Sequence, residues 1–271
     1  GLEKGLISFL DDERKLIQYC NHPKPRNFYN PEEQVQAEAF IRLVTHYKYP
    51  ANRIKMYETV TMGANKKEAD IIVYNDDDCL QPYILVECKK EEVSEAEFLQ
   101  AIEQAYSYAY ALPNDVKFVW VTSNIRNEYF EVDKKLHTKE SQPDIPQLGV
   151  KRLASYKYVY DAASLKDKEG SQRFDDISII EQDELTRRFK QAHDALWAGG
   201  QLNPSEAFDE LDKLIFCKIW DERQDRVAGE PYDFQIHTIS KDDIPNERER
   251  RNFENDSLYK RVINLYEQGR K

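Results

Sequence analysis

Two neighbouring stretches of sequence decide the fold: Glu68-Ala69-Asp70-Ile71-Ile72-Val73-Tyr74 and Tyr83-Ile84-Leu85-Val86-Glu87-Cys88-Lys89. Each is a mostly apolar run of strand length with charged residues near one end, and an acidic turn at residues 75–78 separates them. Because side chains alternate along a strand, Glu87 and Lys89 project to one face and Cys88 to the other. The two runs therefore predict adjacent buried strands with charged groups gathered at one edge of a sheet.

The three charged groups Asp70, Glu87 and Lys89 are costly to bury beside apolar residues unless partners neutralise them. Carboxylate oxygens suit Mg²⁺ or Mn²⁺, so the pattern predicts a divalent cation held by Asp70 and Glu87. Such a cation would stabilise the charge on a phosphate and lower the pKa of an attacking water, which Lys89 would orient or deprotonate. The alternative is that Asp70 caps a turn while Glu87 and Lys89 form a surface ion pair, as an isolated E-x-K commonly does.

The flanking sequence indicates helices on either side of these strands. Asn30-Pro31 and Ser94, the latter with Glu97 three residues later, are typical helix starts. Further strands are expected at residues 54–61 and 117–122, with an edge strand at 128–132. This order predicts an α/β fold, in which a mixed central sheet is flanked by helices.

The domain organisation follows from composition. Residues 1–27 are expected to form a helical lead-in, residues 28–160 the core domain, and residues 161–271 a helical region. The breakers Pro143, Pro146 and Gly149 mark the approach to the end of the core, and residues 156–160 are expected to add a short strand. Helices are expected at residues 184–198, ended by Gly199-Gly200, at residues 203–221 and at residues 258–267.

Bulk properties narrow the class of protein. The 271-residue chain has 40% hydrophobic and 33% charged residues, and we find neither a membrane-spanning run nor a signal peptide. Four scattered cysteines argue against a zinc ribbon or a disulfide framework, which favours a cytoplasmic location. The net charge of −11 counts against DNA binding unless another domain or subunit supplies the affinity. No G-x-x-x-x-G-K-[ST] loop occurs, so no ATP site is expected in this chain.

Four motifs in order resemble the N-terminal nuclease domain of type I restriction enzyme R subunits, a branch of the PD-(D/E)xK superfamily. They are Pro31-Glu32-Glu33-Gln34-Val35, Glu68-Ala69-Asp70-Ile71-Ile72-Val73-Tyr74, Val86-Glu87-Cys88-Lys89 and Gln104-Ala105-Tyr106-Ser107-Tyr108. The resemblance covers roughly residues 28 to 135. It implies that Asp70, Glu87 and the backbone carbonyl of Cys88 bind Mg²⁺, for which Mn²⁺ substitutes, and that Lys89 is the catalytic lysine. Ala69 stands where this family often has a proline, which does no chemistry.

Other residues take roles from their position or from this resemblance. Glu33 is the expected helix-borne acid, facing the sheet and holding a metal-bound water, with Glu32 as the alternative if the register shifts. Glu33 otherwise only favours the helix N-terminus. Gln104 and Tyr108 share one helix face and, by the resemblance, look onto the active site and position DNA or Lys89; otherwise they are core packing. Lys66, Lys67 and Lys90 flank the site and are candidates for phosphate contacts, or else ordinary surface lysines.

The helical region has a second resemblance, carried by Gln191-Ala192-His193-Asp194-Ala195-Leu196-Trp197 and Asn203-Pro204-Ser205-Glu206-Ala207. It is similar to the segment ahead of the catalytic domain in N6-adenine methyltransferases, although no [DN]-P-P-[FYW] motif occurs. An ordinary amphipathic helix pair is the alternative. We therefore expect a fragment whose parent continues into a motor or methylase domain, with ATP needed only by the parent complex if it is a translocating R subunit.

Together these patterns lead to one preferred function. The chain is expected to be a Mg²⁺-dependent endodeoxyribonuclease of a type I-like restriction system. Its expected partners are double-stranded DNA and the methyltransferase and specificity subunits of a restriction–modification complex. The alternative is a non-catalytic DNA-binding or subunit-docking module that keeps the nuclease fold. A nuclease specific for RNA or single strands remains open, because the shared core does not encode the form of the substrate.

Overall fold

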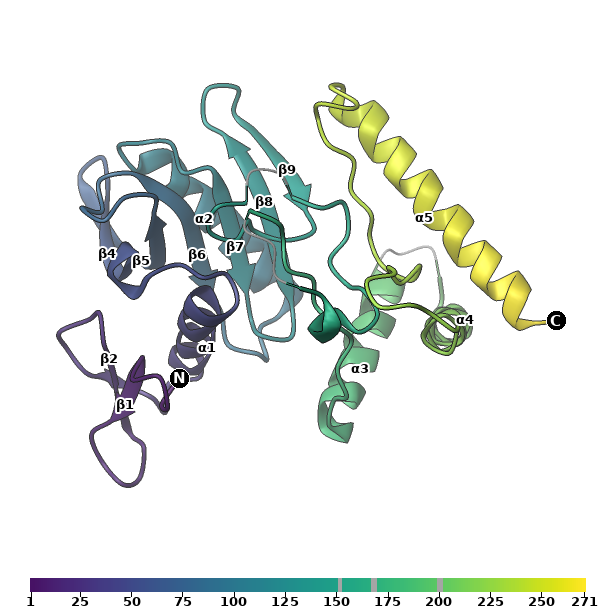
Figure 1. Ribbon diagram of the computed structural model, residues 1–271, viewed down its shortest axis with the longest axis horizontal. Coiled ribbons are helices and arrows are strands. Elements are labelled where there is room, and N and C mark those ends of the chain that lie inside the picture. The colour runs from purple at the N-terminus through teal and green to yellow at the C-terminus, as the bar shows by residue number, and fades with distance from the viewer. Residues whose placement is uncertain (151–152, 167–169, 199–201) are drawn as a thin grey trace. The chain divides into compact units, whose positions relative to one another are not determined.

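A computed structural model describes residues 1–150, 153–166, 170–198 and 202–271 (Figure 1). The chain divides into two compact units, one made of residues 1–153 with 170–172 and the other of residues 154–169 with 173–271. Residues 154–160, which the sequence placed with the first domain, therefore cluster with the second unit.

The first unit is built on a six-stranded sheet (Figure 1). In spatial order its strands are β4 (Ile54–Met62), β5 (Asn65–Tyr74), β6 (Pro82–Cys88), β7 (Phe118–Thr122), β8 (Asn127–Asp133) and β9 (Thr138–Gln142). Strands β6 and β7 run parallel and the other neighbours antiparallel. A parallel pair needs a crossover, which here is α2 (Glu95–Ala111). The predicted α/β fold with a mixed central sheet is confirmed.

Helices α1 (Pro31–Thr45) and α2 pack on the sheet over separate apolar clusters. Along β6, Val86 and Cys88 belong to the cluster that includes α1 residues, whereas Leu85 belongs to the cluster that includes α2 residues. Alternation therefore turns Glu87, like Leu85, toward α2. The helix starts also form as expected, because the Asn30 side chain accepts the Glu32 N–H and Ser94 with Glu97 forms a capping box.

The expected helical lead-in is wrong. The N-terminal residues form a small antiparallel sheet of β1 (Ile7–Phe9), β2 (Leu16–Tyr19) and β3 (Arg26–Asn27). The Asp11 carboxylate accepts the N–H groups of Lys15 and Leu16 and so closes the turn between β1 and β2. Burial in β2 then alternates, with Ile17 and Tyr19 inside, which is a period of two and not the helical 3.6.

The expected edge strand at residues 128–132 is not at the edge. It lies within β8, which pairs with β7 on one side and with β9 on the other. The Asp133 carboxylate accepts the N–H groups of Lys135 and Leu136, and His137 adopts a left-handed φ of 52°, which together reverse the chain. Strand β9 has the polar sequence Thr-Lys-Glu-Ser-Gln, so no hydrophobic alternation marks it.

The second unit is mainly helical, as expected. It contains α3 (Gln182–Ala198), α4 (Pro204–Glu222) and α5 (Glu247–Gly269), and α4 packs against both α3 and α5. Helix α5 begins well before the expected residue 258. The expected strand at residues 156–160 is reduced to isolated bridges at Tyr158 and Val159, and the Gly199-Gly200 helix end lies outside the described residues. Across the described residues, no helix combines the length and the apolar character that crossing a membrane requires.

Candidate active site

The candidate site lies where β5 and β6 separate. The paired residues of these strands run from Tyr74–Pro82 to Ile71–Val86, so Asp70 and Glu87 lie within the strands just beyond the last pair. The strands remain tied together there by a side chain, because the Cys88 N–H donates to Asp70 Oδ2 at 2.7 Å. The sequence motifs thus place the two carboxylates side by side at one end of the central sheet.

Asp70 is held through both of its carboxylate oxygens. Oδ2 accepts from Cys88, and Oδ1 accepts from Nε2 of Gln36 on α1 at 2.8 Å. Burial raises the pKa of Asp70 well above its usual value, and the Glu87 carboxylate raises it further, against the Cys88 N–H and the Lys89 charge. Asp70 is therefore oriented by hydrogen bonds but is costly to ionise while no cation compensates it.

Glu87 is buried, with only 1% of its surface exposed. Its Oε1 accepts from Lys89 Nζ and from Gln104 Nε2, each at 2.8 Å. Its Oε2 is also buried and meets no hydrogen-bond donor among the residues that the structure describes. Burial raises the pKa of Glu87, with Lys89 opposing the shift. One oxygen of this carboxylate is therefore desolvated and uncompensated.

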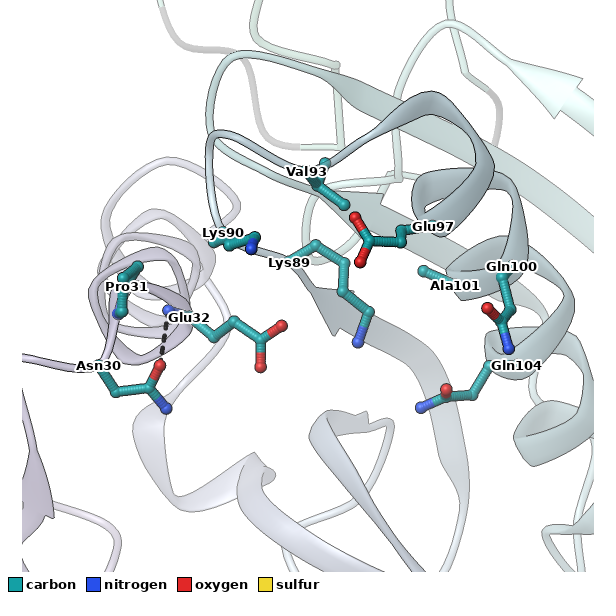
Figure 2. A pocket seen from close by; sticks show the side chains of 10 residues that line it. All are labelled: Asn30, Pro31, Glu32, Lys89, Lys90, Val93, Glu97, Gln100, Ala101 and Gln104. Carbon is teal, nitrogen blue, oxygen red and sulfur yellow. Dashed lines mark hydrogen bonds between the residues drawn. The ribbon is translucent and has the colours of Figure 1, made fainter.

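Lys89 and Gln104 line an open pocket of about 330 Å³. Glu32, at the N-terminal end of α1, lines it from the other side. In Figure 2 the Glu32 carboxylate, the Lys89 ammonium and the Gln104 amide point into the space between the two helices. Burial lowers the pKa of Lys89, but Glu87, Asp70 and Glu32 outweigh this effect and raise it. Lys89 is therefore held as an ammonium facing the pocket.

The expectation that Glu33 is the helix-borne acid at this site is wrong. The Glu33 side chain is buried and accepts hydrogen bonds from the hydroxyls of Tyr19, at 2.5 Å, and Tyr57. Arg26 pairs with it at 3.6 Å and lies over the Tyr57 ring. Successive helical side chains differ by about 100° around the axis, so the pocket receives Glu32, the alternative that a shifted register allowed.

Of the other residues that the sequence suggested for the site, some lie at the pocket and others on the surface. Tyr108 is buried, and burial, with the charges of Glu87 and Asp70, raises its pKa. Lys90 lines the pocket. Lys66 and Lys67 are exposed on β5 and do not line it.

Two glutamines at this site, first of all Gln36, carry no motif that predicts their role. Gln36 is buried, and its amide contacts Asp70 directly. A signal was available, because Gln36 follows Glu32 by one helical turn and so shares its face. Gln100, which lines the pocket on α2, is the second, and it precedes Gln104 by one turn in the same way.

The buried Glu33 network generates a prediction about stability. Tyr57→Phe removes one donor from a buried carboxylate, so we expect the free energy of unfolding to fall by about 1–3 kcal/mol in urea denaturation. Tyr29→Phe is the control, because that hydroxyl is on an exposed side chain, and a change within about 0.5 kcal/mol is expected. Equal stability of Tyr57→Phe and the wild type would show that the Tyr57 hydroxyl contributes nothing.

The raised pKa values of Asp70 and Glu87 predict a pH dependence of the metal-free protein. Above the ordinary carboxyl range, about pH 4, the folded state binds more protons than the unfolded chain. The stability that these groups contribute is thus greatest below this range and is lost as pH rises toward their folded pKa values. We expect Glu87→Gln to gain thermal stability relative to the wild type as the pH rises above about 4. For the exposed control Glu103→Gln, the difference in thermal stability from the wild type should not change with pH. If the difference for Glu87→Gln did not change with pH either, the raised pKa of Glu87 would be contradicted.

Part of the chain is similar to a known family. Residues 31–146 match the family described as type I restriction enzyme R protein N terminus (HSDR_N). The match begins at the first residue of α1 and extends past β9, so it contains Glu32, Asp70, Glu87, Lys89 and Gln104. Among curated proteins, the comparison found none that matches the chain. Residues 31–146 are therefore similar to the N-terminal region of type I restriction enzyme R proteins, which connects this part of the chain with a restriction system.

Proposed function

We propose that residues 31–146 form a Mg²⁺-dependent endodeoxyribonuclease domain that hydrolyses double-stranded DNA within a restriction–modification complex. The observation that carries the proposal is the buried Oε2 of Glu87, which has no hydrogen-bond donor among the described residues. This oxygen belongs to a carboxylate that lies beside Asp70, where β5 and β6 separate. A structural ion pair between Glu87 and Lys89 would not explain why that oxygen is buried.

The donor set fits a hard divalent cation. Asp70 and Glu87 supply carboxylate oxygens, and the backbone carbonyl of Cys88 follows Glu87 directly in the chain. Mg²⁺ prefers oxygen ligands and Mn²⁺ accepts the same set. Burial raises the pKa values of both carboxyl groups, so each is costly to ionise until a cation compensates its charge. We propose Asp70, Glu87 and the Cys88 carbonyl as the ligands.

The chemistry that the cation supplies when bound is a lowered pKa for the attacking water and neutralisation of charge at the scissile phosphate. Lys89 contributes a positive charge facing the pocket, where it donates hydrogen bonds to the phosphate oxygens or the water and stabilises the developing negative charge. Gln104 donates from α2 to Glu87 Oε1 and so orients this ligand, and Tyr108 lies one helical turn after Gln104 on the same helix. Glu32 lines the pocket and would hold a water there, the role expected of Glu33 from the sequence.

The DNA contacts in this proposal centre on the pocket. Lys89 and Lys90 place two cationic side chains at its wall, whereas Lys66 and Lys67 lie outside it on the exposed end of β5. The chain as a whole carries a net charge of −11. Affinity for DNA is therefore expected to come mainly from the specificity and methyltransferase subunits of the complex, with this domain supplying the cleavage chemistry.

Calorimetric titration of Mn²⁺ into the metal-free protein tests the ligand set. We expect saturable binding by the wild type, and a loss of at least about tenfold in affinity for Asp70→Asn and for Glu87→Gln, because each removes a charged ligand. Glu103→Gln, an exposed carboxylate on α2, is the matched control and should bind as the wild type does. Absence of wild-type binding, or binding that neither site variant weakens, would refute the metal site.

The variant Lys89→Met tests whether this domain cleaves DNA or only docks in the complex. Assayed with Mg²⁺ on double-stranded DNA within the parent complex, this variant should retain Mn²⁺ binding but lose cleavage by at least about 100-fold, because the charge facing the phosphate is gone. If complexes that carry Lys89→Met or Asp70→Asn cut DNA as well as the wild-type complex does, this domain is a docking module and another part of the complex cleaves the DNA.

A further inference from the structure

Gln36 makes a contact that packing alone does not explain. It lies on α1 with 6% of its surface exposed, and its Nε2 donates to Asp70 Oδ1 at 2.8 Å. Its Oε1 is buried and meets no donor among the described residues. A buried acceptor without a donor destabilises a folded protein. An apolar side chain of similar size would therefore suit this position better if filling space were the only demand.

Asp70 needs support from outside its own strand. The recorded pairs of β4 with β5 pass from Met56–Ile71 to Glu58–Ala69 and skip Tyr57 and Asp70. Tyr57 has a left-handed φ of 58°, a conformation that a tyrosine rarely adopts. The pairing of β5 with β6 also stops before Asp70. Because both ladders are interrupted here, the orientation of the Asp70 carboxylate depends on its two side-chain hydrogen bonds, to Gln36 and to the Cys88 N–H.

We propose that Gln36 is a positioning residue that holds the Asp70 carboxylate against the Cys88 N–H and thereby sets the affinity of the site for a divalent cation. This inference rests on the proposed function. Gln36 does not line the pocket, so it acts through Asp70 and not by contact with substrate. Its Nε2 occupies one lone pair of Oδ1 and leaves the others for a cation. Partners of this kind, which orient a ligand without binding the metal, typically change metal affinity on the order of 10- to 100-fold.

The test uses Gln36→Met, which keeps the length and volume of the side chain but removes the amide. Gln147→Met is the matched control, because Gln147 is another buried glutamine of the first unit and its amide contacts His46 and not Asp70. Three quantities are measured on the full chain. They are hydrogen exchange of the Cys88 amide in the metal-free protein, Mn²⁺ affinity by calorimetry, and the midpoint of thermal unfolding.

For Gln36→Met we expect Cys88 amide exchange to accelerate at least tenfold and Mn²⁺ affinity to fall about 10- to 100-fold, whatever the change in the unfolding midpoint. Gln147→Met should leave both Cys88 exchange and Mn²⁺ affinity at their wild-type values. Gln36→Asn is the second variant. It keeps the amide but is one methylene too short to reach Asp70, so it should lose Mn²⁺ affinity in the same way, even if Gln36→Met folds poorly.

The outcomes separate the two proposals. Wild-type Mn²⁺ binding that both Gln36 variants leave unchanged would overturn the positioning role and leave the nuclease proposal standing. The same holds if Gln36→Met lowers only the unfolding midpoint, because that is the result of a purely structural residue. Absence of Mn²⁺ binding by the wild type would overturn the proposed function, and the role of Gln36 toward a cation with it.

Discussion

The desolvation of two neighbouring carboxylates, buried Glu87 and partly buried Asp70, is the constraint on which the candidate site depends. Asp70 and Glu87 come together because β5 and β6 are neighbours, and burial prevents water from screening their charges. Each near neighbour reduces this cost in part: Gln36 and the Cys88 N–H at Asp70, Lys89 and Gln104 at Glu87. The compensation is incomplete, since Glu87 Oε2 meets no donor within the described part of the chain. A site that stays under-compensated in the metal-free state is suited to take up a cation.

The groups that surround this pair come from both helices packed on the sheet. Helix α1 contributes Glu32 and Gln36, one turn apart, and α2 contributes Gln104. Helix α2 is also the crossover that makes β6 and β7 parallel, and the Lys89 N–H donates to the Thr122 carbonyl beyond the last residue of β6. The same connection therefore orders the sheet and delivers the amide that holds Glu87. The geometry of the site follows from the topology of the domain as much as from the motif itself.

Two adjacent glutamates of α1, Glu32 and Glu33, lie in different environments. Glu32 faces the pocket, whereas Glu33 is enclosed by Tyr19 of β2, Tyr57 of β4 and Arg26 of β3. This second cluster ties the small N-terminal sheet to the central sheet through one buried carboxylate. The cluster includes Tyr57, which has a left-handed backbone conformation and stands opposite Asp70 in the pairing of β4 with β5. The N-terminal strands thus support the backbone beside the site, although they lie ahead of the segment that matches the family.

The sequence by itself determined the features that depend on neighbours in the chain. Alternation along β6 put Glu87 and Lys89 on one face, capping residues set the starts of α1 and α2, and the order of elements gave the mixed sheet. Tertiary structure alone decided the N-terminal sheet, the polar edge strand β9, and the choice of Glu32 over Glu33. An apolar stripe spans at least about 100° of a helix, so it cannot distinguish consecutive residues at its border. Gln36 and the free oxygen of Glu87 became visible only with the contacts themselves, because a hydrogen bond between residues far apart in sequence leaves no periodic signal.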